Sequence, residues 1–411
     1  MSLNETPSAN RIHIAFFGRR NAGKSSLVNA VTGQNLALVS SVKGTTTDPV
    51  YKAMELLPLG PVVIIDTPGF DDEGELGKMR VNKAKEVLNK TDVAVLVLDG
   101  ELTSETPLQA EEEIISIFKA KNIPYIIILN KSDLALHTED NKHQLCVSVS
   151  PYDNYLKNIL PVSAKTGLNI NLLKEKIAEL SKTDEPEKRI IADLIQRNDF
   201  VILVTPIDKA APKGRLILPQ QQTIRDILDA GGTAIVVKEN ELKETLLNIG
   251  KKPVLVITDS QVFAQVSAIV PPEIKLTSFS ILFARYKGFL ETAVAGASAL
   301  DKLNDCDKIL ICEGCTHHRQ CDDIGTVKIP NLIRKHSGKN PEFEFCGGCD
   351  FPQDLSVFKL IIHCGSCMLN EREVQFRQSL AKEQNIPFTN YGTAIAHMTG
   401  VLERSIEVFK E

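Results

Sequence analysis

The segment after the first apolar run of the chain contains two glycines, a lysine and a serine at fixed spacing. Residues 12–17 (IHIAFF) are followed by Gly18, four further residues, and then Gly23, Lys24 and Ser25 at the start of a helical pattern. Glycines let a loop curl so that its N–H groups face an anion, and the start of a helix adds positive partial charge. The spacing predicts a strand, a phosphate-binding loop and a helix in succession, which restricts this part of the chain to an α/β fold.

Short apolar segments alternate with helical patterns along the whole chain. In the first part they are residues 12–17, 62–66, 93–99, 125–130 and 159–163. Further along they are residues 200–204, 215–218, 233–237, 254–258, 308–312, 343–346, 358–364 and 386–390. This alternation predicts an α/β fold with mostly parallel sheets, in which the P-loop domain precedes two smaller α/β units.

Two segments are suited to be domain boundaries. One is the charged stretch 182–189, and the other is the pair Pro271 and Pro272, which disfavours both helix and strand. We expect three domains, covering residues 1–183, 184–272 and 273–411. The middle unit is rich in β-branched strands and has no recognisable catalytic residues, so we expect it to form a homodimer through an uncovered edge or face, with a plain spacer as the alternative.

Composition narrows the classes of function. The chain has 47 Lys+Arg and 52 Asp+Glu, and its net charge of −5 argues against general polyanion binding, so nucleic acid is not an expected partner. It has no apolar run long enough to span a membrane and no apolar leader, so we expect a cytoplasmic protein without a membrane partner. Most of its 9 cysteines lie between positions 306 and 367, which favours metal binding over disulfides.

The first loop and the second strand end predict how phosphates and Mg²⁺ are held. Lys24 is expected to contact the β and γ phosphates, and the Ser25 hydroxyl to ligate Mg²⁺. Asp66 is expected to hold Mg²⁺ through water, and the N–H of Gly69 to contact the γ phosphate. The other nucleotide-contacting residues expected here are Gly23 and Ser26.

Two later motifs predict recognition of guanine. Asn130, Lys131 and Asp133 follow the apolar segment 125–130. The Asp133 carboxylate can accept hydrogen bonds from guanine N1–H and the 2-amino group, which adenine lacks. A loop that closes on the base is expected at Ser163, Ala164 and Lys165. Four motifs in this order predict a GTPase that uses GTP and Mg²⁺.

Residues 11 to about 181 resemble the GTPases of the Era and TrmE group. That group has a Gly-Thr-Thr segment in its first switch, so the resemblance implies a Mg²⁺ and γ-phosphate role for Thr46. Asn21 matches an asparagine that helps to hold K⁺ beside the phosphates in TrmE-like proteins; stabilisation of a turn is the alternative. The resemblance implies K⁺ activation and assigns catalysis to Lys24, Asp66 and Thr46.

The cysteine-rich part contains two metal-ligand patterns. Cys315 and His317 form a C-x-H motif, and His363, Cys364 and Cys367 form an H-C-x-x-C motif. Two thiolates on one short loop can reach the same iron or zinc, and a distant cysteine completes a three-thiolate face. Each histidine is expected either to ligate the metal as a fourth ligand or to orient a thiolate through a hydrogen bond.

Together with the GTPase motifs, this pattern resembles the FeFe-hydrogenase maturation GTPases of the HydF type. The resemblance covers the whole chain and includes the stretches 211–220, 313–319 and 361–370. It implies a 4Fe-4S cluster on Cys315, Cys364 and Cys367 with an exchangeable fourth ligand. It also implies a scaffold or carrier that receives a diiron precursor from radical-SAM maturases and delivers it to apo FeFe-hydrogenase.

Some cysteines and two other functions stay open. Cys312, Cys321, Cys346 and Cys349 are not needed by that motif; they supply the fourth ligand, hold a second metal or are buried apolar residues, which is the favoured role of Cys312. One alternative is an RNA- or ribosome-associated GTPase with a structural zinc domain, although the C-terminal part has no basic stripe. Another is a metal chaperone for nickel or zinc gated by GTP, and the identity of the metal separates all three.

Overall fold

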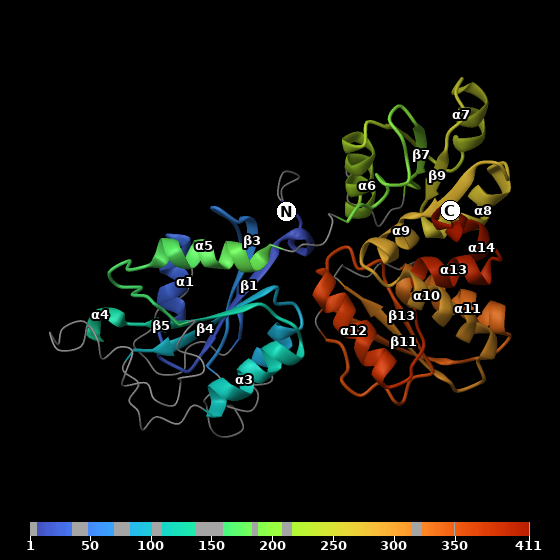
Figure 1. Cartoon of the computed structure of the whole chain (residues 1–411). Coiled ribbons are helices and arrows are strands. Elements are labelled where there is room, and N and C mark those ends of the chain that lie inside the picture. Colours follow the sequence, from blue (N-terminus) through green and yellow to red (C-terminus); the bar gives the residue numbers. More distant parts are fainter. Residues whose placement is uncertain are drawn as a thin grey trace. The chain divides into compact units, whose positions relative to one another are not determined.

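The structure is a computed structural model of the chain (Figure 1). It describes residues 6–34, 48–69, 83–100, 109–135, 159–182, 188–207, 216–314, 323–348 and 350–410. The chain folds into two compact units, Met1–Pro186 and Glu187–Glu411. The predicted boundary at 183/184 lies outside the described residues, and the division into three domains stays a prediction.

The N-terminal unit contains a six-stranded sheet in the order β2-β3-β1-β4-β5-β6. Its strands are β1 (Ile12–Gly18), β2 (Val50–Leu56), β3 (Gly60–Asp66), β4 (Val93–Asp99), β5 (Tyr125–Asn130) and β6 (Ile159–Pro161). All neighbouring strands are parallel except β2 and β3. The five apolar segments predicted for this part are therefore confirmed as the parallel strands of one sheet.

Helices cover both faces of this sheet. The described helices are α1 (Lys24–Thr32), α3 (Gln109–Ala120), α4 (Ser132–Ala135) and α5 (Ile170–Ser181). Leu27 of α1 and Leu173 of α5 share one core with the sheet, and Phe118 of α3 lies in the core of the other face. Because both faces are covered, the central strand β4 is buried along nearly its whole length and is apolar at consecutive positions.

The antiparallel strand β2 was not predicted from the sequence. It lies at the edge of the sheet, and only Leu56 of its seven residues is buried. An edge strand with most side chains in solvent lacks the apolar run by which the other strands are recognised. Its partner β3 supplies the backbone hydrogen bonds that define it.

The C-terminal unit contains two four-stranded sheets, and all neighbouring strands in both are parallel. The first has the order β10-β9-β7-β8 and consists of β7 (Phe200–Val204), β8 (Thr233–Val237), β9 (Leu255–Thr258) and β10 (Lys275–Ser278). The second has the order β12-β11-β13-β14 and consists of β11 (Lys308–Glu313), β12 (Glu342–Gly347), β13 (Leu360–His363) and β14 (Phe388–Asn390). The predicted parallel α/β units are confirmed.

Helices connect the strands of both sheets. Around the first sheet they are α6 (Leu218–Asp229), α7 (Leu242–Asn248) and α8 (Phe263–Ile269). The helical segments that follow the first sheet in the chain are α9 (Phe279–Tyr286), α10 (Leu290–Ala297), η7 (Ser298–Lys302), η8 (Ile324–Lys328), α11 (Ile329–Ser337), α12 (Glu371–Glu383), α13 (Tyr391–Met398) and α14 (Leu402–Ile406). None of the described helices is long and apolar enough to cross a membrane.

Two elements of the first sheet differ from the sequence prediction. The strand predicted at 215–218 is wrong in its described part, because Leu218 begins α6 and Pro219 lies in the first turn of that helix. The side chain of Gln220 accepts a hydrogen bond from the Ile217 N–H at 3.2 Å, which caps the helix start. Conversely, β10 was not predicted, although it completes the sheet.

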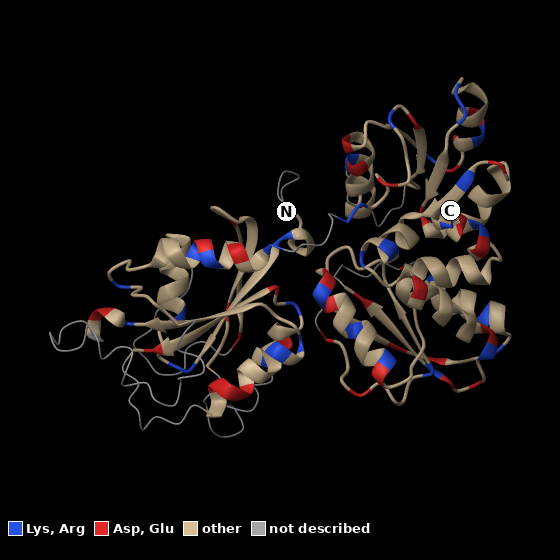
Figure 2. Cartoon of the chain, viewed as in Figure 1, with Lys and Arg blue, Asp and Glu red and all other residues tan. Residues whose placement is uncertain are grey.

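The two sheets of this unit share apolar cores with the C-terminal helices. Ala396 of α13 and Leu402 of α14 lie in the same core as Ile202 and Leu276 of the first sheet. The predicted boundary at 272/273 precedes β10, which pairs with β9. Acidic and basic residues are interspersed along the helices of the unit, including α12 (Figure 2).

Candidate functional site

The loop between β1 and α1 has the backbone that its glycines predict. A Cβ on Gly18 would collide with the Val97 carbonyl oxygen, so this strand end requires glycine. Asn21 and Gly23 both adopt positive φ, at 63° and 85°. The buried Lys24 side chain folds back over the loop and donates to the carbonyl oxygens of Gly18 and Arg19, each at 2.8 Å.

One carboxylate at the end of β3 is suited to bind a divalent cation. The Ser25 hydroxyl donates to Asp66 Oδ2 at 2.5 Å. The other oxygen, Oδ1, is buried and accepts no hydrogen bond from the described residues. Burial raises the pKa of Asp66, against the lowering effects of Ser25 and Lys24. A buried carboxylate oxygen without a donor fits Mg²⁺, for which oxygen ligands are preferred.

Asn130 connects the phosphate loop to the predicted base-binding loop. Its Nδ2 donates to the Ala22 carbonyl at 3.0 Å, and its Oδ1 accepts the Ala164 N–H at 3.2 Å. A Cβ on Gly23 would collide with the Asn130 amide, and the backbone at this position also has positive φ. Both the contact and the turn therefore require glycine at position 23. Lys131 Nζ forms an ion pair with Asp99 Oδ2 at 2.7 Å.

The two guanine motifs meet at a hydrogen bond between Asp133 and Ser163. The buried Ser163 Oγ donates to Asp133 Oδ1 at 2.7 Å and accepts the Thr166 N–H at 3.1 Å. Lys165, next to Ala164, is exposed. The structure therefore brings together the predicted phosphate and base motifs at the carboxyl ends of parallel strands, where open α/β sheets bind ligands.

Other predicted residues lie at the margins of this site. Ser26 lies in the first turn of α1, and Gly69 is the last described residue after β3. Thr46 lies outside the described residues. Sequence reasoning missed the pair of Arg19 and the buried Glu111, which form two hydrogen bonds of 2.6 and 2.8 Å between the phosphate loop and α3. No motif marks this pair, because it joins positions far apart in the chain.

In the C-terminal unit, three chemically active side chains form a row across one sheet. Cys346, Cys312 and His363 occupy equivalent register positions at the carboxyl ends of β12, β11 and β13. Burial raises the pKa of the Cys312 thiol well above its usual value, and this thiol donates a hydrogen bond to Cys346. That hydrogen bond, and secondarily the Arg377 guanidinium, lowers the pKa of Cys346. The favoured buried role of Cys312 fits its place in the core.

The loop after β13 holds the two thiols of the H-C-x-x-C motif. Cys364 Sγ accepts the Gly314 N–H at 3.1 Å and the Ser366 N–H at 3.4 Å. Burial raises the pKa of Cys364, and burial followed by the nearby Cys364 raises the pKa of Cys367 to about 12. Both are free thiols, as are the other described cysteines. A metal is needed to make such buried thiols give up their protons.

Arg377 of α12 is completely buried below this row. Its Nε and Nη2 donate to Glu373 Oε1 at 3.0 and 2.9 Å, and Nη2 also donates to the Gly348 carbonyl at 2.6 Å. Nη1 lies 3.0 Å from His363 Nε2, and the guanidinium carbon lies 5.0 Å from the centre of the Phe351 ring. Sequence reasoning missed Arg377, since a Glu and an Arg four residues apart on a helix usually form a surface pair.

His363 is held at both ring nitrogens. Because a guanidinium only donates, Nε2 accepts from Arg377, and the Nδ1 proton then points to Ser366 Oγ and the Cys364 carbonyl, both at 3.1 Å. Burial, followed by the charge of Arg377, lowers the pKa of His363 to about 3. The ring therefore orients the cysteine loop, and neither nitrogen faces away from these protein partners. Cys315, His317, Cys321 and Cys349 lie outside the described residues.

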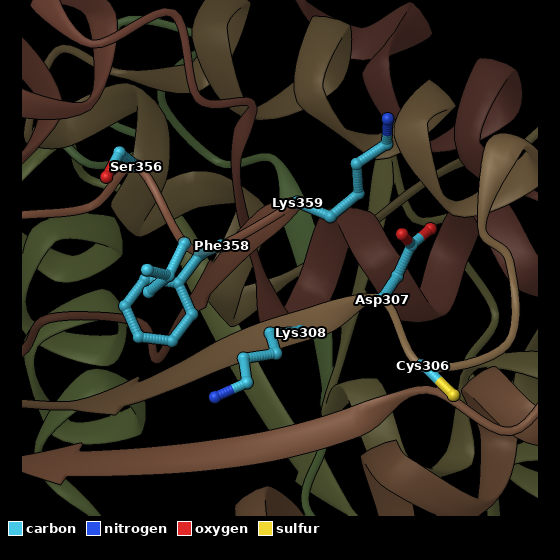
Figure 3. Close-up of a pocket in the computed structure, with 7 residues that line it drawn as sticks. Cys306, Asp307, Lys308, Ser356, Phe358 and Lys359 are labelled. Carbon is cyan, nitrogen blue, oxygen red and sulfur yellow. The ribbon is translucent and has the colours of Figure 1, made fainter.

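A hollow elsewhere in this unit is unconnected to these motifs. It has a volume of about 430 Å³ and lies beside Cys306, Lys308 and Lys359, which precede or begin β11 and β13 (Figure 3). It is therefore at the amino ends of the strands, whereas the thiols of Cys364 and Cys367 follow a carboxyl end. No predicted site residue lines it.

Three family models match successive parts of the chain. Residues 13–131 match the model of a 50S ribosome-binding GTPase. Residues 190–288 match the Hydrogen maturase F dimerization domain, and residues 291–408 match the Hydrogen maturase F tetramerization domain. The N-terminal unit thus carries a GTPase domain, and the C-terminal unit carries two oligomerization domains.

Individual relatives resemble the N-terminal part. GTPase Der of Sulfurimonas denitrificans is 35% identical over 179 residues, which are 42% of this chain and 35% of that protein. GTPase Era of Heliobacterium modesticaldum is 30% identical over 197 residues, 44% and 63% of the two chains. The chain thus spans about a third to two thirds of the length of these relatives. A crystal structure of Aquifex aeolicus Era bound to GDP.AlF4- is 21% identical, covers 58% of this chain and 98% of that chain, and has a TM-score of 0.37.

The buried pair of Arg377 and Glu373 generates a prediction about stability. Replacing Glu373 with Gln leaves a buried guanidinium without its counter-charge, so the free energy of unfolding should fall by about 3–5 kcal/mol in urea titrations followed by circular dichroism. The matched control is Asp229→Asn, which breaks the exposed pair with Arg225 at the same spacing on α6 and should leave the free energy of unfolding nearly unchanged. Equal effects of the two changes would contradict the buried-charge account.

Proposed function

Because the chain belongs to the hydrogen maturase F family, with both family domains behind a GTPase domain, we propose that it hydrolyses GTP and carries a 4Fe-4S cluster in hydrogenase maturation. The observation that carries the proposal is the hydrogen bond from the Gly314 N–H to Cys364 Sγ. Gly314 directly precedes Cys315 in the sequence, so this bond links the residue before the first cysteine motif to the first thiol of the second motif. Cys315, Cys364 and Cys367 then form the cluster site.

The nucleotide site supports GTP hydrolysis, in which water takes up the γ-phosphoryl group and GDP is released. Lys24 lies where its ammonium group can exchange the loop carbonyls for phosphate oxygens. Ser25 and Asp66 would hold Mg²⁺, which neutralises phosphate charge when bound, and the orphaned Asp66 Oδ1 fits that role. Ser163 orients Asp133, whose carboxylate selects guanine over adenine. Thr46 stays a proposed Mg²⁺ and γ-phosphate residue.

The thiol site fits an iron-sulfur cluster by its donor chemistry. Cys364 and Cys367 are soft sulfur ligands on one loop, and cluster binding would offset the cost of ionising these buried thiols. Arg377 places a positive charge near the thiols, which favours an anionic group there. Both ring nitrogens of His363 are engaged by protein groups, so we propose that His363 positions the cysteine loop. The fourth iron would then have an exchangeable ligand, for which His317 stays a candidate. A bound diiron precursor would be cargo, received from radical-SAM maturases and passed to apo FeFe-hydrogenase.

The first sheet of the C-terminal unit supports a homodimer. β8 is the last strand of its sheet, so its outer edge has no strand partner among the described residues. Val236 on this strand is 42% exposed, and Leu228 and Leu247 on the adjoining helices α6 and α7 are 56% and 78% exposed. An uncovered edge next to exposed apolar side chains is suited to pairing with a second copy. The match to a dimerization domain over residues 190–288 supports pairing through this part of the chain.

The role of Asn21 can be tested through the dependence of GTP hydrolysis on monovalent cations. If Asn21 helps to hold K⁺ beside the phosphates, the wild-type rate should be higher in K⁺ than in Na⁺, and Asn21→Ala should bring the ratio of the two rates to about one. Lys24→Ala serves as the positive control and should lower the rate about 100-fold or more in both salts, because a transition-state charge contact is lost. An Asn21→Ala protein that keeps the full K⁺ effect would leave Asn21 with the turn-stabilising role.

The cluster site can be tested by anaerobic reconstitution with iron and sulfide. Serine at Cys364 or Cys367 should empty the site, whereas Cys346→Ser, which changes the thiol hydrogen-bonded to Cys312, should keep most of the iron. The measurements are iron, sulfide and zinc content, together with EPR of the reduced protein. GTP hydrolysis should persist in all three variants, since the nucleotide loops belong to the other unit. Zinc without sulfide in the wild type, or an emptied site in Cys346→Ser with full iron in Cys364→Ser, would overturn the assignment.

The dimer surface can be tested by placing a charge on the edge strand. Val236→Lys adds a charge at a half-exposed apolar position, so it should shift the protein from dimer to monomer at micromolar concentration. Multi-angle light scattering measures the mass directly. The matched control is Val50→Lys, at a 41% exposed valine on β2, the edge strand of the N-terminal unit, which should keep the mass of the wild type. A wild-type protein that is already monomeric would contradict the proposal.

A further inference from the structure

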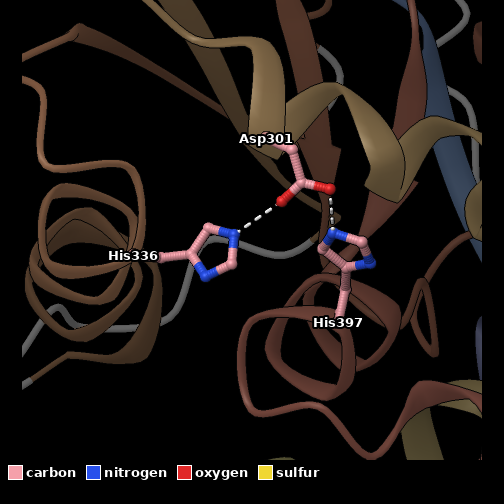
Figure 4. Close-up of side chains that lie close together, drawn as sticks. All are labelled: Asp301, His336 and His397. Carbon is pink, nitrogen blue, oxygen red and sulfur yellow. Dashed lines mark hydrogen bonds and ion pairs between the residues drawn. The ribbon is translucent and has the colours of Figure 1, made fainter.

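Three polar side chains outside the sites described above converge in the C-terminal unit. Asp301 of η7 lies between His336, in the last turn of α11, and His397, in the last turn of α13 (Figure 4). The two carboxylate oxygens of Asp301 each contact one imidazole: Oδ1 lies 2.8 Å from His336 Nε2, and Oδ2 lies 2.9 Å from His397 Nε2. The candidate ligand atoms all lie within 4.8 Å of one another.

This cluster lies toward the amino ends of the strands of its sheet, whereas the thiols lie at the carboxyl ends. In a parallel sheet each helix runs back from the carboxyl end of one strand to the amino end of the next. The helix α11 follows β11 and α13 follows β14, so both end toward the amino ends of the strands, and η7 comes before β11. The cysteine loop instead follows the carboxyl end of β13. The cluster is therefore a separate site.

The distances are close to those within a metal coordination sphere. Zinc bonds to imidazole nitrogen and carboxylate oxygen are about 2.0–2.2 Å, which puts ligand atoms of a tetrahedral site about 3.3 Å apart. The contacts of 2.8 and 2.9 Å, which involve the two different oxygens of Asp301, need to open by a few tenths of an ångström, and the remaining separations, all within 4.8 Å, need to close around the ion. The Asp301, His336 and His397 side chains are 51%, 26% and 23% exposed, so a metal can enter and water can complete its coordination.

The local charge favours a cation. The Asp301 carboxylate brings negative charge to within 2.9 Å of both imidazoles. Both histidines lie at helix C-termini, where carbonyl groups carry negative partial charge. The adjacent Arg334 is turned to other partners, with its Nε donating to Asn340 Oδ1 at 3.0 Å and its guanidinium over the Phe343 ring.

We propose that Asp301, His336 and His397 form a binding site for a divalent transition metal, with zinc as the principal ion. Two imidazoles and one carboxylate are ligands of borderline softness that suit zinc, nickel or cobalt, whereas magnesium and calcium prefer oxygen ligands alone. Three protein ligands leave at least one position for water. A bound ion would join η7, α11 and α13, three segments that meet only through tertiary packing.

The competing account is a surface ion pair in which one carboxylate serves two histidines. Such pairs contribute little to stability and bind no metal. In that account the two imidazoles, whose ring centroids are 5.8 Å apart, contact only the carboxylate. In the proposed site one metal ion lies between the three side chains, so the two accounts differ in zinc stoichiometry.

Isothermal titration of the reduced, chelator-treated full chain with zinc distinguishes them. The wild type should bind one equivalent more than His336→Gln or His397→Gln, with affinity at this site falling more than about 100-fold in each variant, since even a residue that only supports a ligand changes affinity by 10–100-fold. The matched control is Asp305→Asn, an exposed aspartate nearby, which should bind as the wild type does. Equal stoichiometry and affinity in the wild type and both histidine variants would overturn the proposal.

Two further measurements separate this site from the thiols and from misfolding. Cys364→Ser should lose a different equivalent of zinc, so that combining it with His336→Gln removes both. Without metal, the histidine variants should unfold at the wild-type temperature, because the altered side chains are on the surface. With excess zinc, only proteins that retain all three ligands should gain the additional rise in midpoint that ligand binding to the folded state produces. The same rise in His336→Gln and His397→Gln would overturn the proposal.

Discussion

Parallel strand pairing is the constraint on which both units depend. Two neighbouring parallel strands need a crossover that returns from the carboxyl end of one strand to the amino end of the next. The loops that leave the strands therefore lie together at the carboxyl ends, and the loops that enter them lie together at the amino ends. In the N-terminal unit this brings the loop after Gly18 together with Asp66, Asn130 and Ser163. In the C-terminal unit it brings Cys364, which follows β13, next to Gly314, which follows the paired strand β11. In each unit, residues from motifs that are far apart in the sequence thus meet at the carboxyl ends of the strands.

In the second sheet of the C-terminal unit, a charged side chain is buried at the carboxyl ends of the strands. Arg377 uses its donors on Glu373, Gly348 and His363, so a cation is held in a place from which water is excluded. Burial of such a pair is costly, and an apolar replacement of both partners is often as stable. The pair also acts on its neighbours: after burial, the Arg377 charge lowers the pKa of His363, which accepts a hydrogen bond from it, and the same charge partly offsets the cost that burial imposes on a charged Cys364 thiol.

Metal binding at this edge would be linked to proton release and to local order. Cys364 and Cys367 have raised pKa values, so they are protonated thiols at neutral pH in the structure. Ligation replaces those protons, and the backbone N–H groups of Gly314 and Ser366 are already directed at one sulfur. The cluster of Asp301, His336 and His397 differs in each respect, since it is exposed, harder in donor character and at the other end of the strands.

The local sequence determined the phosphate loop, the buried parallel strands and the cysteine motifs, because spacing and apolar runs act over a few neighbouring residues. It did not predict β2, which is exposed at an edge, or β10, and it suggested a strand at 215–218 where a helix instead begins at Leu218 with Pro219 in its first turn. Tertiary structure alone decided that Arg377 is buried and that both nitrogens of His363 are engaged. It alone brought Asp301 to His336 and His397, which are 35 and 96 residues away, because only helix packing determines which distant side chains meet.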